Sequence, residues 1–501
     1  MADLADEIRK IAEQVLQSPD IRALLAQSGS EAAPAAQTQA APAQPAPALA
    51  PAVQAAPAGS RPGIYGSVDA AVAAAAVAQR ELVALPLGKR KACLDAMRRV
   101  IAWNNRDLST QAVAETGLGN VTDKMAKNTL AAEKTPGVED VEPWVRTDEH
   151  GLTLTELAPW GVIGTITPMT NPIATIVSNA IGMIAAGNTV VFNVHPNAKG
   201  ISNRLIGMLN EAIMAEGGPR DLLCAVAEPT LETAGQLMKH PGIQLLVVTG
   251  GPAVVRAAMG SGRKSICAGP GNPPCVVDQT ADLVKAGRDI VAGAGFDHGI
   301  VCICEKEVLA VESIADRLKD EMKKNGAFEL TGAQIDAVTR LVIADPGGPG
   351  KDGAPNKAWV GKAPADIARA AGVQVPDGTK ILLMEVGRDH PLVWTEQLMP
   401  VLPLVRMKNV DEAIDFAVVV EHGYRHTAMM HSHDVEKLSR MARAMDCSLF
   451  VKNGPCVAGL GYGGAGHTSF TIASPTGDGI TRPRTFTRER RCTLVDAFRI
   501  V

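Results

Sequence analysis

Between residues 161 and 260 the sequence alternates short β-branched runs with longer segments of helical spacing. Strands are expected at 161–167, 189–194, 222–226 and 244–249, and helices at 172–186, 199–216, 230–239 and 252–260. Parallel strands joined by crossover helices form a sheet that is covered on both faces. The pattern therefore predicts a doubly wound α/β domain whose ligand lies at the carboxyl ends of the strands.

A second alternating region begins near Ala268. Strands are expected near 276–278, 306–311, 339–343, 380–384, 402–406 and 448–452, with helices such as 312–325 and 434–445. Two α/β domains with a cleft between them is the economical architecture. Upstream, residues 65–134 look mainly helical, and residues 149–156 (EHGLTLTE) are expected to form a strand-rich arm.

The N-terminal segment differs in composition from the rest of the chain. Residues 1–18 place Leu4, Ile8, Ile11, Val15 and Leu16 at helical spacing with charges on the other face. Residues 28–63 are rich in Ala, Pro and Gln, which predicts a disordered, partly polyproline II linker. Residues 1–27 are then a recruitment peptide for another protein, a docking helix for a sister subunit or a frayed terminus.

Composition excludes several classes of function. The 501 residues are 46% hydrophobic with a formal charge of -4, which suits a soluble protein of two or more domains. Aromatic residues make up 3% and basic residues are not clustered, so no nucleic acid partner is expected. No uncharged apolar run approaches the roughly 18 to 20 residues that span a bilayer, and the N-terminus lacks a signal peptide's apolar core. The sequence predicts a cytosolic protein without membrane contact.

Nine cysteines, an odd number spread along the chain, indicate reduced thiols. Cys302 and Cys304 lack a second CxC or CxxC, so no metal site is expected. Cys302 ends an apolar run just before the strand-like EVLAV (307–311), which is where an enzyme could hold a thiol nucleophile. Taken alone, the same residue could be a small hydrophobic core residue.

Six ordered segments resemble those of the aldehyde dehydrogenase superfamily over about residues 64–495. They are ITPMTNP (166–172), VFNVHPNAK (191–199), VVTGG (247–251), CAGPGNPP (267–274), FDHGIVCICEKE (296–307) and EQLMPVLP (396–403). In detail they are similar to the CoA-acylating branch found in bacterial microcompartments. The resemblance implies an NAD-binding domain at 64–266 with an arm near 145–158, a catalytic domain at 267–455, and a C-terminal return and oligomerisation segment at 456–501.

The resemblance also implies a place for the protein in the cell. Residues 1–27 look like the encapsulation peptide of that group, which would bind shell proteins and bring the enzyme into the microcompartment lumen within the cytoplasm. A homo-oligomer is implied, in which the arm and the C-terminal LVDAFRIV (494–501) could pair across subunits.

By resemblance, Cys302 attacks a short-chain aldehyde, such as propanal, a hydride passes to NAD, and a thioester remains on Cys302. Hydrolytic members carry a glutamate base where this chain has Ala268. Water needs such a base to attack a thioester quickly, whereas coenzyme A brings a thiol with a pKa near 8.5. CoA is therefore expected as the acyl acceptor.

An oxyanion donor is implied at Asn171, one residue later than in the hydrolytic pattern, where Thr170 stands instead. Alternatively, Asn171 only caps the helix that begins at Pro172. Residues assigned to the cofactor by the resemblance are Thr167, Pro168, His195, Thr249, Gly250, Gly251 and Glu396. His195 replaces a lysine of related enzymes, which favours NAD over NADP.

One motif is discounted. GYGGAG (461–466) satisfies GxGxxG, but no helix or βαβ unit is expected around it, so a glycine-rich loop near the cleft is predicted. Two rivals of the acylating enzyme stay open. One is a hydrolytic dehydrogenase that releases the free acid, and the other is a catalytically inactive cargo or scaffold protein.

Overall fold

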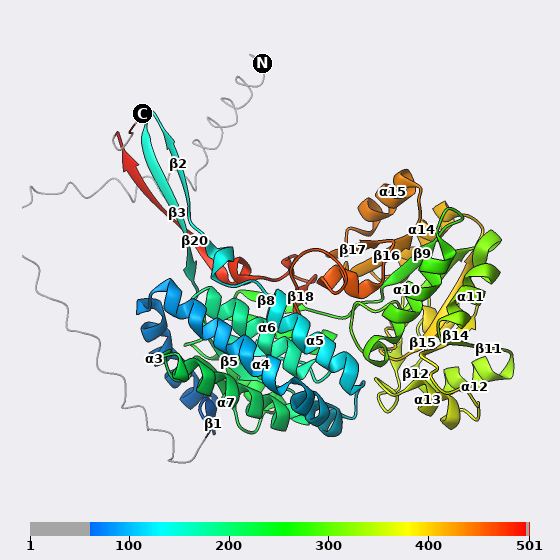
Figure 1. The fold of residues 1–501 in the computed structure, drawn as a ribbon, viewed down its shortest axis with the longest axis horizontal. Helices are drawn as coiled ribbons and strands as arrows, with labels where there is room; N and C mark the ends of the chain where they lie inside the picture. The colour runs from blue at the N-terminus through cyan, green and yellow to red at the C-terminus, as the bar shows by residue number, and fades with distance from the viewer. Residues whose placement is uncertain (1–60, 497–499, 501) are drawn as a thin grey trace, which may run out of the picture. The chain divides into compact units, whose positions relative to one another are not determined.

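The computed structural model describes residues 61–496 and residue 500 (Figure 1). The helix expected within residues 1–27, and the linker up to residue 60, lie outside the described residues. Residues 61–63, which the linker was expected to include, form a turn that leads into β1 (Ile64–Tyr65). The Gly63 N–H donates to Asp221 Oδ1 at 2.8 Å, so these three residues belong to the folded part of the chain.

Three helices follow β1 and confirm the helical character expected for residues 65–134. They are α3 (Val68–Ala84), α4 (Leu87–Thr116) and α5 (Val121–Lys134). The Ser67 and Asn120 side chains accept backbone N–H groups at the starts of α3 and α5. Helix α4 ends at Gly117, whose φ of 68° is the left-handed conformation common after a helix.

The first sheet has six parallel strands in the order β1-β6-β5-β4-β7-β8. Its further strands are β4 (Val162–Ile166), β5 (Thr189–Asn193), β6 (Leu223–Val226), β7 (Leu245–Thr249) and β8 (Ser265–Ala268), and its helices are α6 (Pro172–Ala185), α7 (Lys199–Ala215), α8 (Leu231–Lys239) and α9 (Pro252–Met259). Every element expected between residues 161 and 260 is confirmed. The strand order reverses direction at β4, so the carboxyl ends of β4 and β7 form a topological switch point.

Strand β8 corrects the boundary expected between residues 266 and 267. It pairs with β7, with Val248 opposite Cys267 and Thr249 opposite Ala268. The first sheet therefore extends through Ala268.

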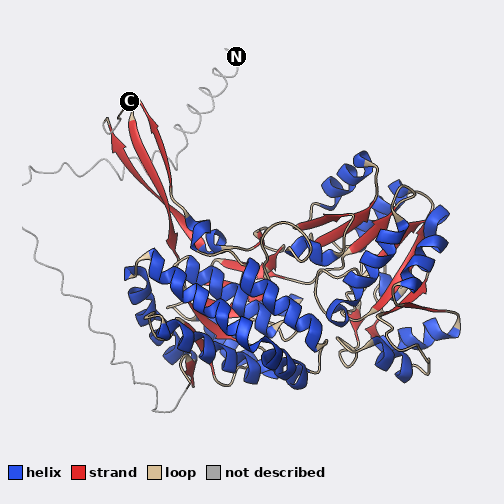
Figure 2. Ribbon diagram, in the orientation of Figure 1, coloured by secondary structure: helices blue, strands red, loops and turns tan. Residues whose placement is uncertain are grey.

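The second sheet has seven parallel strands in the order β11-β14-β15-β10-β9-β16-β17. They are β9 (Pro274–Val277), β10 (Glu307–Val311), β11 (Ala327–Leu330), β14 (Ile381–Glu385), β15 (Val401–Met407), β16 (Thr427–His431) and β17 (Leu449–Lys452). The associated helices are α10 (Leu283–Gly295), α11 (Ala315–Lys324), α12 (Ala333–Val342), α13 (Pro364–Ala370), α14 (Val410–Val420) and α15 (Val435–Met445). The two α/β regions are visible as separate groups of layers in Figures 1 and 2.

The strand expected at residues 339–343 is wrong. Helix α12 continues to Val342, and the strand that follows, β12 (Ile343–Asp345), pairs antiparallel with β13 (Ala354–Pro355). Val338 and Val342 are buried at helical spacing. A short apolar run at the end of an amphipathic helix has the same local pattern as a buried strand.

The arm is a three-stranded antiparallel sheet of β2 (Trp144–Asp148), β3 (Gly151–Pro159) and β20 (Thr487–Val495), seen as long red strands in Figure 2. Side chains alternate between the two faces of such a sheet. By the strand register, one face carries the apolar Val145, Leu152, Leu154, Cys492 and Leu494, next to Thr147, Glu156 and Arg490. This apolar arm face contrasts with the opposite, mainly polar face.

Two further strands, β18 (Ile472–Ala473) and β19 (Gly479–Ile480), pair with each other in the C-terminal return. The GYGGAG segment (461–466) follows the short 3-10 helix η6 (Cys456–Leu460) and is a loop, as predicted. Within residues 61–496, no helix is both long enough and apolar enough to cross a membrane.

Candidate active site

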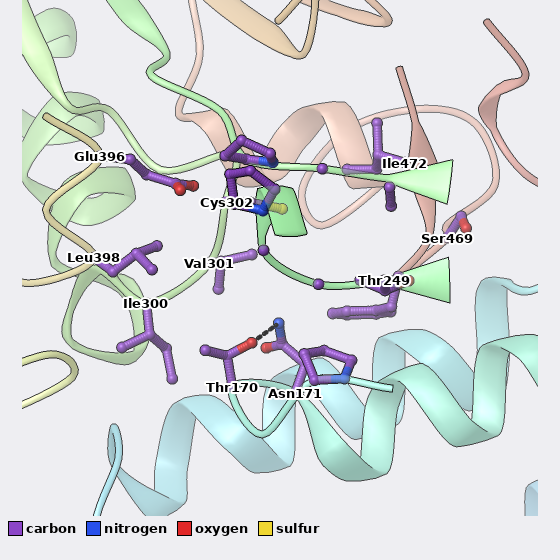
Figure 3. A pocket seen from close by; sticks show the side chains of 18 of the residues that line it. Thr170, Asn171, Thr249, Ile300, Val301, Cys302, Glu396, Leu398, Ser469 and Ile472 are labelled. Carbon is purple, nitrogen blue, oxygen red and sulfur yellow. Dashed lines mark hydrogen bonds between the residues drawn. The ribbon is translucent and has the colours of Figure 1, made fainter. Parts of the chain in front are cut away.

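A cavity of about 180 Å³ lies beyond the carboxyl ends of β7 and β8, where segments from both α/β regions meet (Figure 3). Cys302 and Asn171 line the same cavity. The remaining lining residues include Thr170, Thr249, Gly250, Gly251, Ala268, Ile300, Val301, Glu396, Leu398, Leu460, Ser469, Phe470 and Ile472. The walls are largely apolar, and a few polar groups converge near the sulfur, as in many small-molecule sites.

A strained turn presents Cys302 to this cavity. In the 3-10 segment η3 (Phe296–Gly299), Asp297, His298 and Gly299 have φ values of 49°, 56° and 68°. A Cβ at position 299 would lie 2.8 Å from the backbone of Met399. The buried Lys306 ammonium donates to the Gly299 carbonyl at 2.9 Å. Glycine is therefore required at position 299. The hydrogen bond from Lys306 stabilises the turn.

The environment of the cavity disfavours the thiolate form of Cys302. Burial, together with the nearby Glu396 carboxylate, raises the pKa of Cys302 to about 12, while Lys306 acts in the opposite direction. The thiol is thus protonated near neutral pH. Its proton must leave as the sulfur attacks an electrophile.

Asn171 occupies the N-cap position of α6, and its carbonyl accepts the Thr175 N–H at 3.0 Å. Its side chain, however, does not cap the helix. Oδ1 accepts from Lys127 Nζ at 2.5 Å, and Nδ2 lies 3.3 Å from Thr170 Oγ1. Figure 3 shows the amide pointing into the cavity from the side opposite Cys302. The alternative that Asn171 serves only as a side-chain cap is therefore wrong.

Three buried charged residues behind Asn171 were missed by the sequence analysis. Asp297 is fully buried and pairs with both Lys124 and Lys127 of α5, with Lys124 Nζ at 3.1 Å. Its Oδ1 also accepts the Asn120 N–H at 2.8 Å. Burial and the neighbouring Lys127 lower the pKa of Lys124 to about 8. In the sequence, lysines at this spacing look like a solvated helix face, and only the partner from η3 reveals their role.

A buried imidazole, that of His426, was also missed. A Cβ at Gly271 would lie 2.9 Å from its ring and 3.2 Å from the Cys302 carbonyl, so His426 and the nucleophile flank the same glycine. Burial lowers the pKa of His426 to about 4, which keeps the ring neutral. His426 is one of four histidines within residues 422–433, and nothing in the sequence distinguished it from the other three.

Glu396 and Ala268 both line the cavity that contains the Cys302 sulfur, one with a carboxyl group and the other with a methyl group. Glu396 Oε1 accepts the Gly271 N–H at 3.1 Å, and burial raises the pKa of this carboxyl to about 7. Ala268, at the end of β8, contributes a methyl group to the lining. Among the described residues that line the cavity, Glu396 supplies the one carboxylate.

A second pocket, of about 750 Å³, lies at the switch point between β4 and β7. It contains six of the seven residues assigned to a cofactor, namely Thr167, Pro168, His195, Thr249, Gly250 and Gly251. The seventh, Glu396, lines the Cys302 cavity and not this second pocket. Pro168, Thr170 and Thr249 to Pro252 line both pockets, so the two spaces are adjacent and share a wall.

The second pocket fits a dinucleotide. Gly250 and Gly251 lead into the N-terminus of α9, where backbone N–H groups can face a pyrophosphate. Within the described chain, the buried Thr167 Oγ1 has no hydrogen-bond partner and is free for a ligand. His195 Nδ1 accepts the Asn197 N–H at 3.1 Å, and burial lowers the pKa of His195, so the ring is neutral near pH 7.

Comparisons with known proteins find relatives that are similar over most of the chain. The model of the aldehyde dehydrogenase family matches residues 40–340. The acetaldehyde dehydrogenase (acetylating) of Salmonella typhimurium is 51% identical over 436 residues, which are 87% of this chain and 93% of that protein.

Two solved structures are similar over most of the chain. The propionaldehyde dehydrogenase of Rhodopseudomonas palustris, with bound CoA and an acylated cysteine, has a TM-score of 0.85 and 46% identity, covering 88% of this chain and 99% of that one. The propionaldehyde dehydrogenase from the fucose utilisation bacterial microcompartment of Clostridium phytofermentans has a TM-score of 0.85 and 42% identity, covering 88% and 100%.

Proposed function

The chain belongs to the aldehyde dehydrogenase family, and we propose that it oxidises a short-chain aldehyde to its acyl-CoA, with NAD as hydride acceptor. Its relatives include acetylating and propionaldehyde dehydrogenases. The observation that carries the proposal is the Cys302 cavity itself. It lies next to a dinucleotide-sized pocket and has a methyl group, from Ala268, where hydrolytic members carry a base.

Cys302 is the nucleophile. Its sulfur forms a bond to the aldehyde carbon, the thiol proton passes to solvent, and the carbonyl π electrons move to oxygen, which gives the anion of a thiohemiacetal. The negative oxygen accepts hydrogen bonds from the Cys302 backbone N–H and from Asn171 Nδ2. The bound NAD supplies a hydride acceptor, and loss of the hydride leaves a thioester on Cys302.

Coenzyme A releases the acyl group. Its thiol attacks the Cys302 thioester, the same donors stabilise the second oxyanion, and the C–S bond to Cys302 breaks as that sulfur recovers a proton. Water competes poorly, because Ala268 offers no carboxylate to deprotonate it. The intermediate is thereby kept for CoA.

The second pocket supports NAD as the cofactor. This pocket is lined by Thr167, Pro168, His195 and the turn from Thr249 to Gly251. Glu396 lines the Cys302 cavity, where the nicotinamide would meet the sulfur. Among the described residues that line this pocket there is no lysine or arginine. A ribose hydroxyl would fit such a lining better than a 2′-phosphate.

The decisive experiment follows NADH formation by purified protein with NAD and propanal, with and without CoA, while mass spectrometry detects propanoyl-CoA. We expect turnover that depends on CoA and is lost in Cys302→Ala. Turnover without CoA, with release of propanoate, would identify the hydrolytic rival. No turnover with either propanal or acetaldehyde would support the hypothesis of a catalytically inactive scaffold protein. The ratio of kcat/KM for these two aldehydes then defines the substrate.

Encapsulation is a separate part of the proposal, supported by the microcompartment origin of a similar protein and by the sequence of residues 1–27. Fusing residues 1–60 to a fluorescent protein in cells that make shells should give puncta. A matched fusion with Ile8→Glu and Ile11→Glu, which interrupts the apolar face, should be diffuse. Puncta that persist in the matched fusion would rule out recognition of that face.

A further inference from the structure

We propose that Lys127 is a positioning residue for catalysis, because it fixes the orientation of the Asn171 amide that faces the oxyanion. This inference rests on the oxyanion role proposed for Asn171. Lys127 does not line the cavity itself. It acts from α5 through a single hydrogen bond, from Nζ to Asn171 Oδ1 at 2.5 Å.

The chemistry of the contact decides which end of the amide faces the substrate. A lysine ammonium only donates, so the amide must turn its oxygen toward Lys127. Nδ2 then points toward the cavity, where it donates to Thr170 Oγ1 at 3.3 Å, as Figure 3 shows. Without the ammonium, the two ends of the amide differ little in size, and the flipped amide would place an oxygen against the oxyanion. The ammonium also polarises the amide and strengthens its N–H as a donor.

The lysine is held in place by Asp297. Its carboxylate is fully buried and pairs with both Lys127 and Lys124, and the side chains of these two lysines are each 3% exposed. A buried ammonium without such a partner would carry a large desolvation cost. Lys124 donates to Asp297 and, at 3.4 Å, to the Thr170 carbonyl, but within the described part of the chain it makes no hydrogen bond to Asn171.

The same cluster connects the donor to the nucleophile. Asp297 belongs to η3, the turn that leads to Cys302, and its backbone N–H donates to Asp123 Oδ2 of α5 at 2.8 Å. The buried cluster around Asp297 therefore contacts two segments. One is the start of α6, which carries Asn171, and the other is the turn that leads to Cys302. Both must keep their places for the oxyanion to form between them.

Two reactions of Cys302 need no cofactor. Comparing their rates distinguishes loss of the Asn171 orientation from a general disruption of the site. Acylation by p-nitrophenyl propanoate passes through an oxyanion and releases p-nitrophenolate, while the propanoyl group stays on sulfur as a thioester. Alkylation by iodoacetamide displaces iodide and forms no oxyanion. Mass spectrometry of the Cys302 peptide confirms the site in both reactions.

The variants to compare are Lys127→Met and Lys124→Met. Both remove a buried ammonium from Asp297 and keep a similar side-chain volume, but only Lys127 contacts Asn171. Removing an oxyanion donor costs about 10² to 10³ in rate. We expect Lys127→Met to slow acylation at least about tenfold more than Lys124→Met does, with alkylation in both variants within about twofold of the parent. For propanal oxidation, kcat should fall with KM unchanged.

Asn171→Ala distinguishes failure of the inference from failure of its premise. If Asn171→Ala leaves acylation intact, the amide is not the oxyanion donor and the premise fails. If Asn171→Ala slows acylation but Lys127→Met matches Lys124→Met, only the positioning role is overturned. Because Lys127 acts through Asn171, adding Lys127→Met to Asn171→Ala should slow acylation by no more than about twofold. Additive losses would contradict the proposal.

Discussion

At the scale of single residues, the site is defined by what stands next to Cys302. Glu396 is a carboxylate that opposes the thiolate, Lys306 is a cation that favours it, and Ala268 is a methyl group where a base could stand. The first two act on the pKa of the thiol in opposite directions. In the proposed mechanism, the third determines whether CoA or water ends the reaction.

Replacing Ala268 tests the choice between CoA and water. Ala268→Glu would place a carboxylate in the cavity, and a positioned general base contributes about 10² to 10⁴ in rate. We expect propanoate release without CoA to rise at least about tenfold, measured as CoA-independent NADH formation. Ala268→Gln is the control, since its side chain has a similar size and cannot take the proton. Equal hydrolysis in the two variants would show that volume, and not basicity, governs access of water.

The ionisation of Cys302 predicts a pH dependence. Because its pKa is raised to about 12, the thiolate fraction and the rate of alkylation by iodoacetamide should increase about tenfold per pH unit from pH 8 to 10. Above pH 7 Glu396 is mostly ionised and disfavours the neighbouring thiolate. Glu396→Gln should therefore lower the pKa of Cys302 and accelerate alkylation over this range. The exposed Glu436→Gln serves as control. Slower alkylation in Glu396→Gln would contradict the assigned sign.

At the scale of elements, the turn η3 joins the helix α10 to the nucleophile and stores backbone strain. Two of its residues, Asp297 and His298, adopt left-handed φ values that non-glycine residues rarely occupy. The buried ion pairs of Asp297 offset the cost of its backbone conformation, and the hydrogen bond from Lys306 to the Gly299 carbonyl stabilises the turn. Local sequence preferences oppose this conformation, so contacts from distant elements must impose it.

Gly299→Ala tests the fit of this turn. The φ of 68° disfavours alanine by about 1 kcal/mol, and the Cβ contact of 2.8 Å with Met399 adds an overpacking cost of about 1 to 3 kcal/mol. Gly463→Ala is a matched control, because Gly463 has a φ of 71° but nothing within 4 Å of its Cβ. We expect the apparent Tm to fall clearly more in Gly299→Ala, together with activity. Equal shifts would mean that the backbone at position 299 relaxes freely.

At the scale of the whole molecule, the arm presents an apolar sheet face. The exposed fractions of Val145 and Leu494 on the apolar arm face are 52% and 45%. Exposed apolar faces of this kind mark interaction sites. We therefore retain the prediction that the arm joins subunits of a homo-oligomer.

A pair of adjacent substitutions tests this prediction. Leu494→Glu places a charge on the apolar arm face, and Thr493→Glu places the same charge one residue away on the polar face. Burying an unpaired carboxylate in an interface is strongly unfavourable. Sedimentation velocity should show a smaller species for Leu494→Glu and the parent assembly for Thr493→Glu. An unchanged mass for Leu494→Glu would exclude this face from the interface.

The sequence alone determined the elements whose pattern is local. Alternating strands and helices over residues 161–260 predicted the first sheet, and ordered motifs predicted that Cys302, Asn171 and the cofactor residues belong to one site. The strand and helix pattern is confirmed because hydrophobic periodicity depends on neighbouring residues, whereas the site residues follow from the family resemblance that the motifs carry. The same argument explains the error at 339–343, where three apolar residues (341–343) suit the end of a helix as well as a strand.

The tertiary structure decided what depends on residues far apart in the chain. It pairs β3 with β20 and joins Lys127 to Asp297, 170 residues away, and it sets the environments that move the pKa values of Cys302 and Glu396. Charge burial and packing arise only when segments meet, so no local pattern encodes them. The lysines of α5 look like solvated surface residues in the sequence because the carboxylate that buries them lies on η3, the turn that leads to the nucleophile.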